Sequence, residues 1–354
     1  MSIRPTLSVV IPNYNHACFF PLLLESIFEQ SFQPTEVIVL DDASTDNSIE
    51  LLKEFATKQP SLRFVKNERN MGAVYTFNKV FKMATCDYVF CPSADDLIRP
   101  GFFEKSMILL AAHPQAALCS SNLVLINEEG DEVAVRYKPV ISADSRYFSP
   151  QELRQLITRY GPWIDCGSII ARRDCMMQEG YFMEKLGSFS DTMVTHVVAL
   201  RWGACFIPEV LSCWRRMPTG FSSTSGRDWK ALMAKGRLAA DLMRSKYQDL
   251  FPSAFVARFE NRWKYMVGVT SSRRALQQGN DELSEIINAI WPTGGYAKSA
   301  LRTFVSFTFK CLTIVCWMFF ALSYGPWTWW YRARASIVLN LKGHPLLTKL
   351  RARN

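Results

Sequence analysis

The sequence predicts an α/β fold with a mostly parallel central sheet flanked by helices. Short apolar runs rich in β-branched residues occur at 7–11, 36–40, 62–65 and 88–91, and each of the first three is followed by an amphipathic stretch. Such alternation with short links is typical of a doubly wound sheet. With 354 residues and 49% hydrophobic content, the chain can bury a sizeable core.

Several helix starts are marked by residues that satisfy the exposed N–H groups of a first turn. Asn47 with Glu50 three residues later suggests a capping box. Ser149 with Glu152 suggests a second one, and Pro150 suits the first helical position. We therefore expect helices to begin close to both places.

The pattern changes after Ala116. The stretch around Glu129-Gly130 predicts a β-hairpin, and 167–171 predicts another short strand. Asp191 opens a predicted helix that Gly203 closes. Residues 228–290 have the mixed charge and periodicity of amphipathic helices.

Charge and composition divide the chain into three predicted parts. Residues 1–216 are predicted to form the α/β domain, 217–290 a helical extension, and 291–354 a basic aromatic tail. The tail has nine Lys or Arg and no Asp or Glu, which equals the net charge of +9. A positive charge confined to an aromatic tail indicates an anionic membrane surface as partner and argues against nucleic acid.

The tail leaves its mode of attachment open. Its longest apolar run, 311–323, has 13 residues, fewer than the roughly 20 that a spanning helix needs. We favour peripheral or monotopic attachment at the cytoplasmic face of the inner membrane. A single span and a soluble helical dimerisation domain remain alternatives, and the latter would make the protein a homo-oligomer.

Cysteine and histidine usage argues against disulfides and zinc. The ten cysteines include no CxxC pair, and the four histidines are scattered. We therefore expect reduced thiols and structural roles for His16, His113 and His196. The N-terminus shows no apolar segment typical of a secretory signal.

Polar residues follow three predicted strands: Asn13-Tyr14-Asn15, Asp41-Asp42 and Asp95-Asp96. The carboxyl ends of parallel strands lie at one edge of a sheet, so these groups should converge. An Asp after a strand is often only a helix cap, and that alternative stays open for each one.

These groups suit a nucleotide and a cation. A carboxylate after the second strand can accept hydrogen bonds from a base imide or a ribose hydroxyl, and Asp95 with Asp96 can hold Mg²⁺ or Mn²⁺. The sequence has neither G-x-G-x-x-G nor G-x-x-x-x-G-K, so a cation would neutralise a diphosphate in place of a glycine loop.

Four segments occur along the first part of the chain, in the order "LSVVIPNYN", "VIVLDDASTDNS", "NERNMGAVYTFN" and "CPSADD". By these segments and the distances between them, residues 6–216 resemble the family 2 glycosyltransferases of the GT-A fold. It implies a nucleotide site lined by Pro12, Tyr14, Asn15, Asp42 and Asn70. It also gives Asp95 and Asp96 the metal-binding role, with Ser93 where the family often has another acid.

The segment "GSFSDTMVTHVVALRWGACFIPEVLSCWRR" resembles the part of the family that carries the catalytic base. The match gives Asp191 this role, with Ser190 at a position where an acid is usual; Asp191 as a helix cap is the alternative. Four further candidates are weaker, because packing or solvation explains them equally well: Trp163 and Asp165 at the acceptor site, and Arg215 and Arg216 at the phosphates.

The resemblance implies an inverting glycosyltransferase, an enzyme of the EC 2.4 class, that uses a nucleotide-diphosphate sugar, with UDP-sugars favoured. Its acceptor would be a hydroxyl of a lipid-linked or growing surface glycan, and its cofactor Mn²⁺ or Mg²⁺. Because Ser93 and Ser190 replace usual acids, a catalytically silent nucleotide-sugar-binding scaffold is the alternative. A nucleotidyltransferase is disfavoured, since no Gly-rich basic loop follows the first strand.

Overall fold

The computed structural model describes residues 5–135, 141–217 and 220–278, together with 282, 285, 286 and 289. The elements up to residue 135 are β1 (Leu7–Asn13), α1 (Phe20–Phe28), β2 (Glu36–Asp41), α2 (Ser48–Lys58), β3 (Leu62–Lys66), α3 (Ala73–Met83), β4 (Tyr88–Phe90), β5 (Leu97–Ile98), α4 (Phe102–Ala112), β6 (Leu118–Ile126) and β7 (Glu132–Val135). The later elements are β8 (Arg146–Phe148), α5 (Pro150–Tyr160), η1 (Cys166–Ser168), β9 (Ile169–Arg172), α6 (Arg173–Glu179), η2 (Glu184–Phe189), α7 (Ser190–Trp202), β10 (Ala204–Arg215), α8 (Phe221–Thr224), α9 (Trp229–Arg244) and α10 (Ser253–Gln278).

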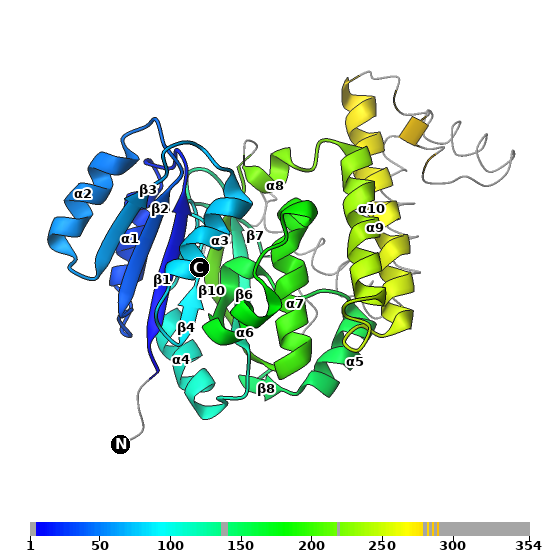
Figure 1. Cartoon of the computed structure of the whole chain (residues 1–354), viewed down its shortest axis with the longest axis horizontal. Helices are drawn as coiled ribbons and strands as arrows, with labels where there is room; N and C mark the ends of the chain where they lie inside the picture. Colours follow the sequence, from blue (N-terminus) through cyan, green and yellow to red (C-terminus); the bar gives the residue numbers. More distant parts are fainter. Residues whose placement is uncertain are drawn as a thin grey trace, which may run out of the picture. The chain divides into compact units, whose positions relative to one another are not determined.

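The strands form one mixed sheet in the order β3-β2-β1-β4-β9-β6-β10-β5, with β7 beside β6 and β8 beside β10 (Figure 1). The first four strands are parallel, as the sequence predicts. Antiparallel pairings of β9 with β4 and β6 then join this half to the parallel pair β6–β10. The carboxyl ends of β1, β2 and β4 therefore lie at one edge.

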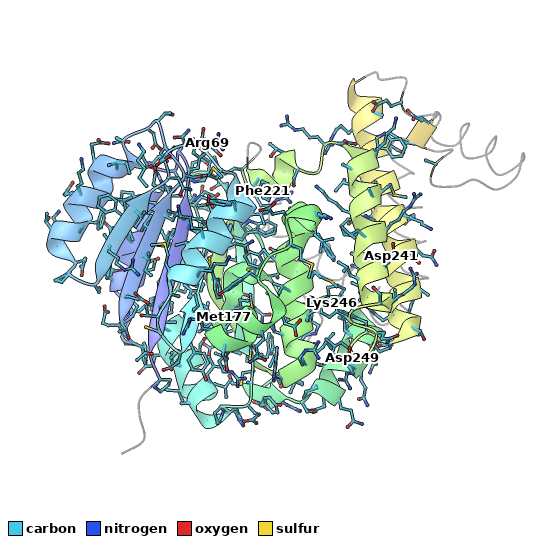
Figure 2. The ribbon with its side chains drawn as sticks, viewed as in Figure 1. Arg69, Met177, Phe221, Asp241, Lys246 and Asp249 are labelled. Atoms are coloured by element: carbon cyan, nitrogen blue, oxygen red, sulfur yellow. The ribbon has the colours of Figure 1, made fainter. Side chains whose placement is uncertain are left out.

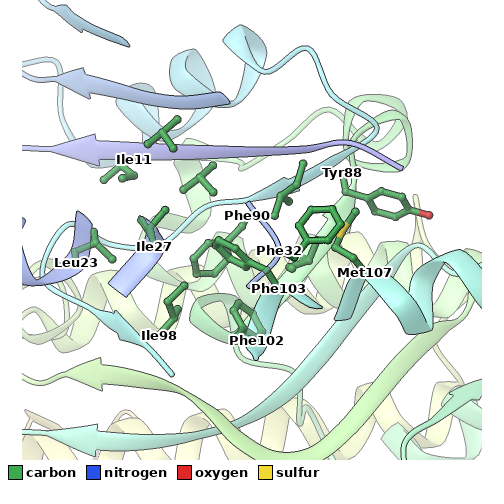
Figure 3. Close-up of a cluster of buried hydrophobic side chains, with 14 of the residues drawn as sticks. Ile11, Leu23, Ile27, Phe32, Tyr88, Phe90, Ile98, Phe102, Phe103 and Met107 are labelled. Carbon is green, nitrogen blue, oxygen red and sulfur yellow. The ribbon is translucent and has the colours of Figure 1, made fainter. Parts of the chain in front are cut away.

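The two faces of the parallel half pack against different helices. Alternate residues of β1, beginning with Leu7, share a core with α1 and α4, while α3 covers β1 and β2. Phe90, Phe102 and Phe103 lie at the centre of this core, with ring centroids 5.2–5.7 Å apart (Figure 3). Edge-on aromatic packing of this kind holds α4 against the strand that precedes the acidic pair.

The structure extends β1 through Pro12, where the sequence predicts an end. Pro12 pairs with Leu40 of β2, but the pairing of β1 with β4 stops at Val9. Beyond Val9 the strand has a partner on one side, so the missing N–H of proline removes no ladder hydrogen bond.

Of the two predicted capping boxes, one forms. The Oγ of Ser149 accepts from the amide of Glu152, whose carboxylate accepts from the amide of Ser149. The box predicted at Asn47 is wrong, because Asn47 makes no side-chain cap. Asp46 accepts from the amide and the hydroxyl of Ser48 instead, one residue earlier than expected.

By its internal contacts the chain divides into two compact units, one of Met1–Gly226 with Arg237–Val256 and one of Arg227–Gly236 with Ala257–Asn354. In the second unit, Trp263 lies against Gly236 of α9, and its indole Nε1 donates to the carbonyl of Leu232 at 2.8 Å. Within the described part of the chain, no helix is both long and apolar enough to cross a membrane. The predicted tail, 291–354, lies outside the described residues.

Candidate nucleotide and metal site

Asp41 and Asn15 fix the loop after β1 against the loop after β2. The buried carboxylate of Asp41 accepts from Asn13 Nδ2 at 2.8 Å and from the amide and hydroxyl of Ser44. Asn15 has a positive φ of 57°, and its Oδ1 accepts from the amide of Thr45 at 2.8 Å. Asn15 thereby joins the two loops. This structural role is separate from the nucleotide contact that the sequence predicts for Asn15.

Asp42 anchors the loop that follows β3. Its carboxylate, 3% exposed, accepts from Asn67 Nδ2 at 2.7 Å and from the amides of Met71 and Gly72, both at 2.9 Å. Asn70 also accepts from Gly72 N. Asp42 thus shapes the segment that carries Asn70, and any nucleotide contact would use its remaining lone pairs.

The other residues predicted to bind the nucleotide lie at the same edge of the sheet. Pro12 precedes the loop after β1 and is partly exposed, and Tyr14, within that loop, is 42% exposed. Asn70 and Arg69 are exposed in the loop after β3, and Figure 2 marks Arg69 at this edge. The structure therefore presents these side chains to solvent around the ends of β1 to β3.

Asp95 and Asp96 lie next to each other between β4 and β5; Asp96 is buried, and Asp95 is partly exposed. Burial raises the pKa of Asp95, while the nearby charges of His16 and Arg215 lower it in part. Burial and then the charge of Asp95 raise the pKa of Asp96 well above its usual range. Two such groups repel each other when ionised, so a bound cation would stabilise the pair.

Arg215, at the end of β10, is 2% exposed. Its main-chain amide donates to Asp96 Oδ1 at 3.0 Å, and its Nε donates to the carbonyl of Asp95 at 2.8 Å. Nη1 donates to the carbonyls of Asn127 and Glu128. Arg216, the next residue, is exposed, so the two arginines occupy different environments.

Asp191 lies in the first turn of α7 and is partly exposed. Its carboxylate accepts from the amide of Thr192 at 2.5 Å. Ser190, where the family usually has an acid, is buried, and its hydroxyl accepts from the amide of Met183. Ser190 therefore has a packing role beside the candidate base.

His196 joins α7 to the loop before η1. Its Nδ1 lies 2.7 Å from the carbonyl of Thr192, and its Nε2 accepts from the amides of Trp163 and Ile164 at 3.1 and 3.4 Å. This network assigns the proton to Nδ1. Trp163 is 4% exposed and packs edge-on against Phe206, so its indole belongs to the core.

Cys166 reveals how the acidic groups converge. Burial raises the pKa of its thiol well above the usual range, and the charges of Asp191, Asp165 and Asp96 raise it further. Next to it, a Cβ placed on Gly167 would lie 3.3 Å from Asp96 Oδ2. The charges of the predicted base, one predicted acceptor residue and one predicted metal ligand thus all act on a cysteine that no sequence motif identifies.

The two carboxylates of Asp95 and Asp96 suit a cation whose remaining ligands come from the substrate and water. Among the described residues, no three His, Cys, Asp or Glu side chains form a metal cluster. Mg²⁺ commonly uses one or two protein carboxylates and completes its shell with phosphate oxygens and water. Asp95 and Asp96 fit that arrangement, because they are adjacent carboxylates that repel each other when ionised and Asp95 is partly exposed.

The part of the chain that carries the acidic pair matches a known protein family. Residues 8–179 match the model of Glycosyl transferase family 2. The chain carries a glycosyltransferase family 2 domain. The matched segment includes β1 to β4 and the Asp95–Asp96 pair, and it ends before Asp191.

Relatives of this family 2 domain are similar over part of their length. The chain is 37% identical over 109 residues to the uncharacterized glycosyltransferase YibD of Escherichia coli, which is 31% of each chain. S. aureus TarS in complex with UDP-GlcNAc superposes with a TM-score of 0.61 at 18% identity, over 80% of this chain and 79% of TarS. The mannosyltransferase PcManGT of Pyrobaculum calidifontis, solved with GDP-Man and Mn²⁺, superposes with a TM-score of 0.56 at 19% identity. The superposition covers 97% of this chain and 89% of PcManGT. These likenesses confirm the predicted GT-A fold.

Proposed function

We propose that the protein transfers a sugar from a nucleotide-diphosphate donor to an acceptor hydroxyl, with inversion. One observation carries the proposal: Gly167 lies against Asp96, where a Cβ would be 3.3 Å from Oδ2, and the charges of Asp165 and Asp191 act on the neighbouring Cys166 thiol. The candidate metal ligand Asp96 and the candidate base Asp191 therefore both lie near Cys166 and Gly167, which supports their assignment to one site. This is the arrangement that a single displacement requires.

We assign the cation to Asp95 and Asp96, with Mn²⁺ or Mg²⁺ as the candidates. When bound, the cation would neutralise the diphosphate and make it a better leaving group. The raised pKa of both acids supports this assignment, because their ionised forms lack enough compensating charge in the protein alone. PcManGT, which shares the fold, was solved with Mn²⁺.

Asp191 is the proposed base. Its carboxylate removes the proton of the acceptor hydroxyl while that oxygen bonds to the anomeric carbon, and the bond to the diphosphate oxygen breaks on the opposite face. The base and the leaving group must stand on opposite sides of the sugar. Asp191 lies in α7 and the acid pair lies between β4 and β5, so the proposed base and the proposed cation site come from separate elements.

The remaining site residues receive proposed binding roles. Pro12, Tyr14, Asn15, Asp42 and Asn70 contact the nucleotide, and UDP is the favoured one because TarS binds UDP-GlcNAc. Asp165 helps to bind the acceptor, supported by its charge beside Cys166. Trp163 receives no acceptor role in this proposal, because the residue is buried and its main-chain amide donates to His196 Nε2.

The acceptor and the cellular site are proposals from the sequence. A lipid-linked or growing surface glycan at the cytoplasmic face of the inner membrane would suit a basic aromatic tail that binds anionic lipid. Deletion of residues 291–354 should release the protein from vesicles that contain phosphatidylglycerol. Retention of the truncated form on these vesicles would contradict the assignment.

The transfer proposal is tested by donor turnover. Purified protein with Mn²⁺ and a panel of UDP- and GDP-sugars should release free nucleotide when membrane extract supplies the acceptor. Asp191→Asn should abolish release and retain donor binding. Asp174→Asn is a matched control, because Asp174 also lies in a first helical turn and accepts from the next amide. Donor binding without any turnover would favour the scaffold alternative.

A further inference from the structure

We propose that Arg215 is a positioning residue that holds the Asp95–Asp96 pair in the arrangement that binds a divalent cation. The inference rests on the proposed function, because it presumes the cation. It differs from direct phosphate binding, the role that the sequence suggests for Arg215. The evidence is the set of hydrogen bonds that this buried arginine makes to both acidic residues.

Two donors of Arg215 act on the acidic pair. The main-chain amide donates to the carboxylate of Asp96 at 3.0 Å, which fixes the orientation of that side chain. The Nε donates to the carbonyl of Asp95 at 2.8 Å, which fixes the backbone between the two acids. The amide bond to Asp96 depends on the backbone of β10, whereas the Nε bond to the carbonyl of Asp95 depends on the arginine side chain, and it is this second bond that a substitution of Arg215 removes.

The guanidinium is itself held by two other segments. Nη1 donates to Asn127 O at 2.7 Å and to Glu128 O at 2.6 Å, in the turn between β6 and β7. Cζ lies 4.6 Å from the ring centroid of Phe19, in the segment before α1. A lysine has no planar fork of donors, so it cannot make this set of contacts.

The charge of Arg215 complements the pair. Two ionised carboxylates and one guanidinium leave one formal negative charge, and a divalent cation would reverse it to one positive charge. A site of that charge attracts a diphosphate. In the described part of the chain, Nη2 of Arg215 is buried and has no hydrogen-bond partner, which leaves the guanidinium with unused donor capacity in this region.

Arg215→Lys tests the inference through Mn²⁺ affinity. Electron paramagnetic resonance would follow Mn²⁺ binding in the presence of UDP and, separately, GDP. Loss of a residue that orients metal ligands typically weakens metal binding about 10- to 100-fold, and we expect a change of this size. Nucleotide affinity measured without metal should fall less than Mn²⁺ affinity, and an equal fall of both would indicate direct phosphate binding and overturn the positioning role.

Arg172→Lys is the matched control. Arg172 also donates from its guanidinium to a backbone carbonyl, that of Pro114 at 2.6 Å, but at the end of β9. Its replacement should lower the melting temperature and leave Mn²⁺ affinity unchanged. Phe19→Leu provides a second test if Arg215→Lys fails to fold, since it loosens the guanidinium and should weaken Mn²⁺ binding severalfold.

The outcomes separate the inference from the proposed function. If wild type binds no Mn²⁺ with either nucleotide, the metal-assisted function itself fails. If wild type binds Mn²⁺ and the folded Arg215 and Phe19 variants bind it equally well, the positioning role is wrong. Equal weakening in the Arg172 variant would also overturn it, because the effect would then reflect general loss of stability.

Discussion

Replacement of Asp42 tests whether this carboxylate anchors the loop after β3. It accepts three hydrogen bonds, from Asn67 Nδ2 and the amides of Met71 and Gly72. A hydrogen bond to a charged group contributes about 1.5–3 kcal/mol, and two of these donors become solvated once the loop opens. Three hydrogen bonds at the low end of that range predict that Asp42→Ala reduces the free energy of unfolding by about 3–5 kcal/mol. Asp42→Asn should reduce it by roughly half as much, because the amide oxygen still accepts hydrogen bonds but carries no charge.

Urea unfolding followed by circular dichroism measures these losses, and amide hydrogen exchange locates them. Protection of Met71 and Gly72 should fall in Asp42→Asn. It should persist in Asp41→Asn, because Asp41 is equally buried but holds Asn13 and Ser44. Unchanged exchange at Met71 and Gly72, or an Asp42→Ala variant within about 0.5 kcal/mol of wild type, would refute the anchoring role.

Three further predictions concern other parts of the molecule. A Cβ on Gly236 would lie 2.1 Å from Trp263 Cδ1. Gly236→Ala should therefore lower stability by about 1–3 kcal/mol despite the better helix propensity of alanine, and a raised melting temperature would contradict this. Ser149→Ala removes a capping box and should cost about 0.5–2 kcal/mol in urea unfolding, whereas Ser149→Asp should retain most of it. The pKa values of Asp95 and Asp96 are raised in the folded protein, so the unfolded chain loses these protons at a lower pH than the folded one. The metal-free protein should therefore lose stability as the pH rises from about 4, the ordinary pKa of an Asp, to the raised pKa values. The rise in melting temperature caused by Mn²⁺ with UDP should grow over the same pH range. A rise that does not depend on pH would argue against Asp95 and Asp96 as metal ligands.

The parallel half of the fold was predictable because its signals are local. Each of β1 to β4 is a short apolar run, and a helix is the next element after each of β1, β2 and β3. The second half was harder to predict. The 12-residue strand β10 contains Pro208 and Glu209, and its pairing with β6 shifts register there, which interrupts the apolar pattern. β5 has two residues and depends on β10 for pairing.

The site was predictable in its residue types and less so in its contacts. Adjacent acids after a strand indicate Asp95 and Asp96, whereas the support from Arg215 comes from a residue far along the chain. The burial of Trp163 and the position of Cys166 depend on packing against α7 and β10. No periodicity or spacing encodes such contacts, because they arise between segments that are distant in sequence.

The bond between Arg215 and Asp96 has a consequence for synthesis on the ribosome. The two residues are 119 positions apart, and β5 pairs with the same strand. A nascent chain that ends before β10 can pair β1 to β4, but its acidic turn lacks the strand that orients it. Competence to bind a metal–nucleotide complex should therefore arise late, after the whole sheet has been translated, so unfinished chains would not sequester cellular nucleotide sugars.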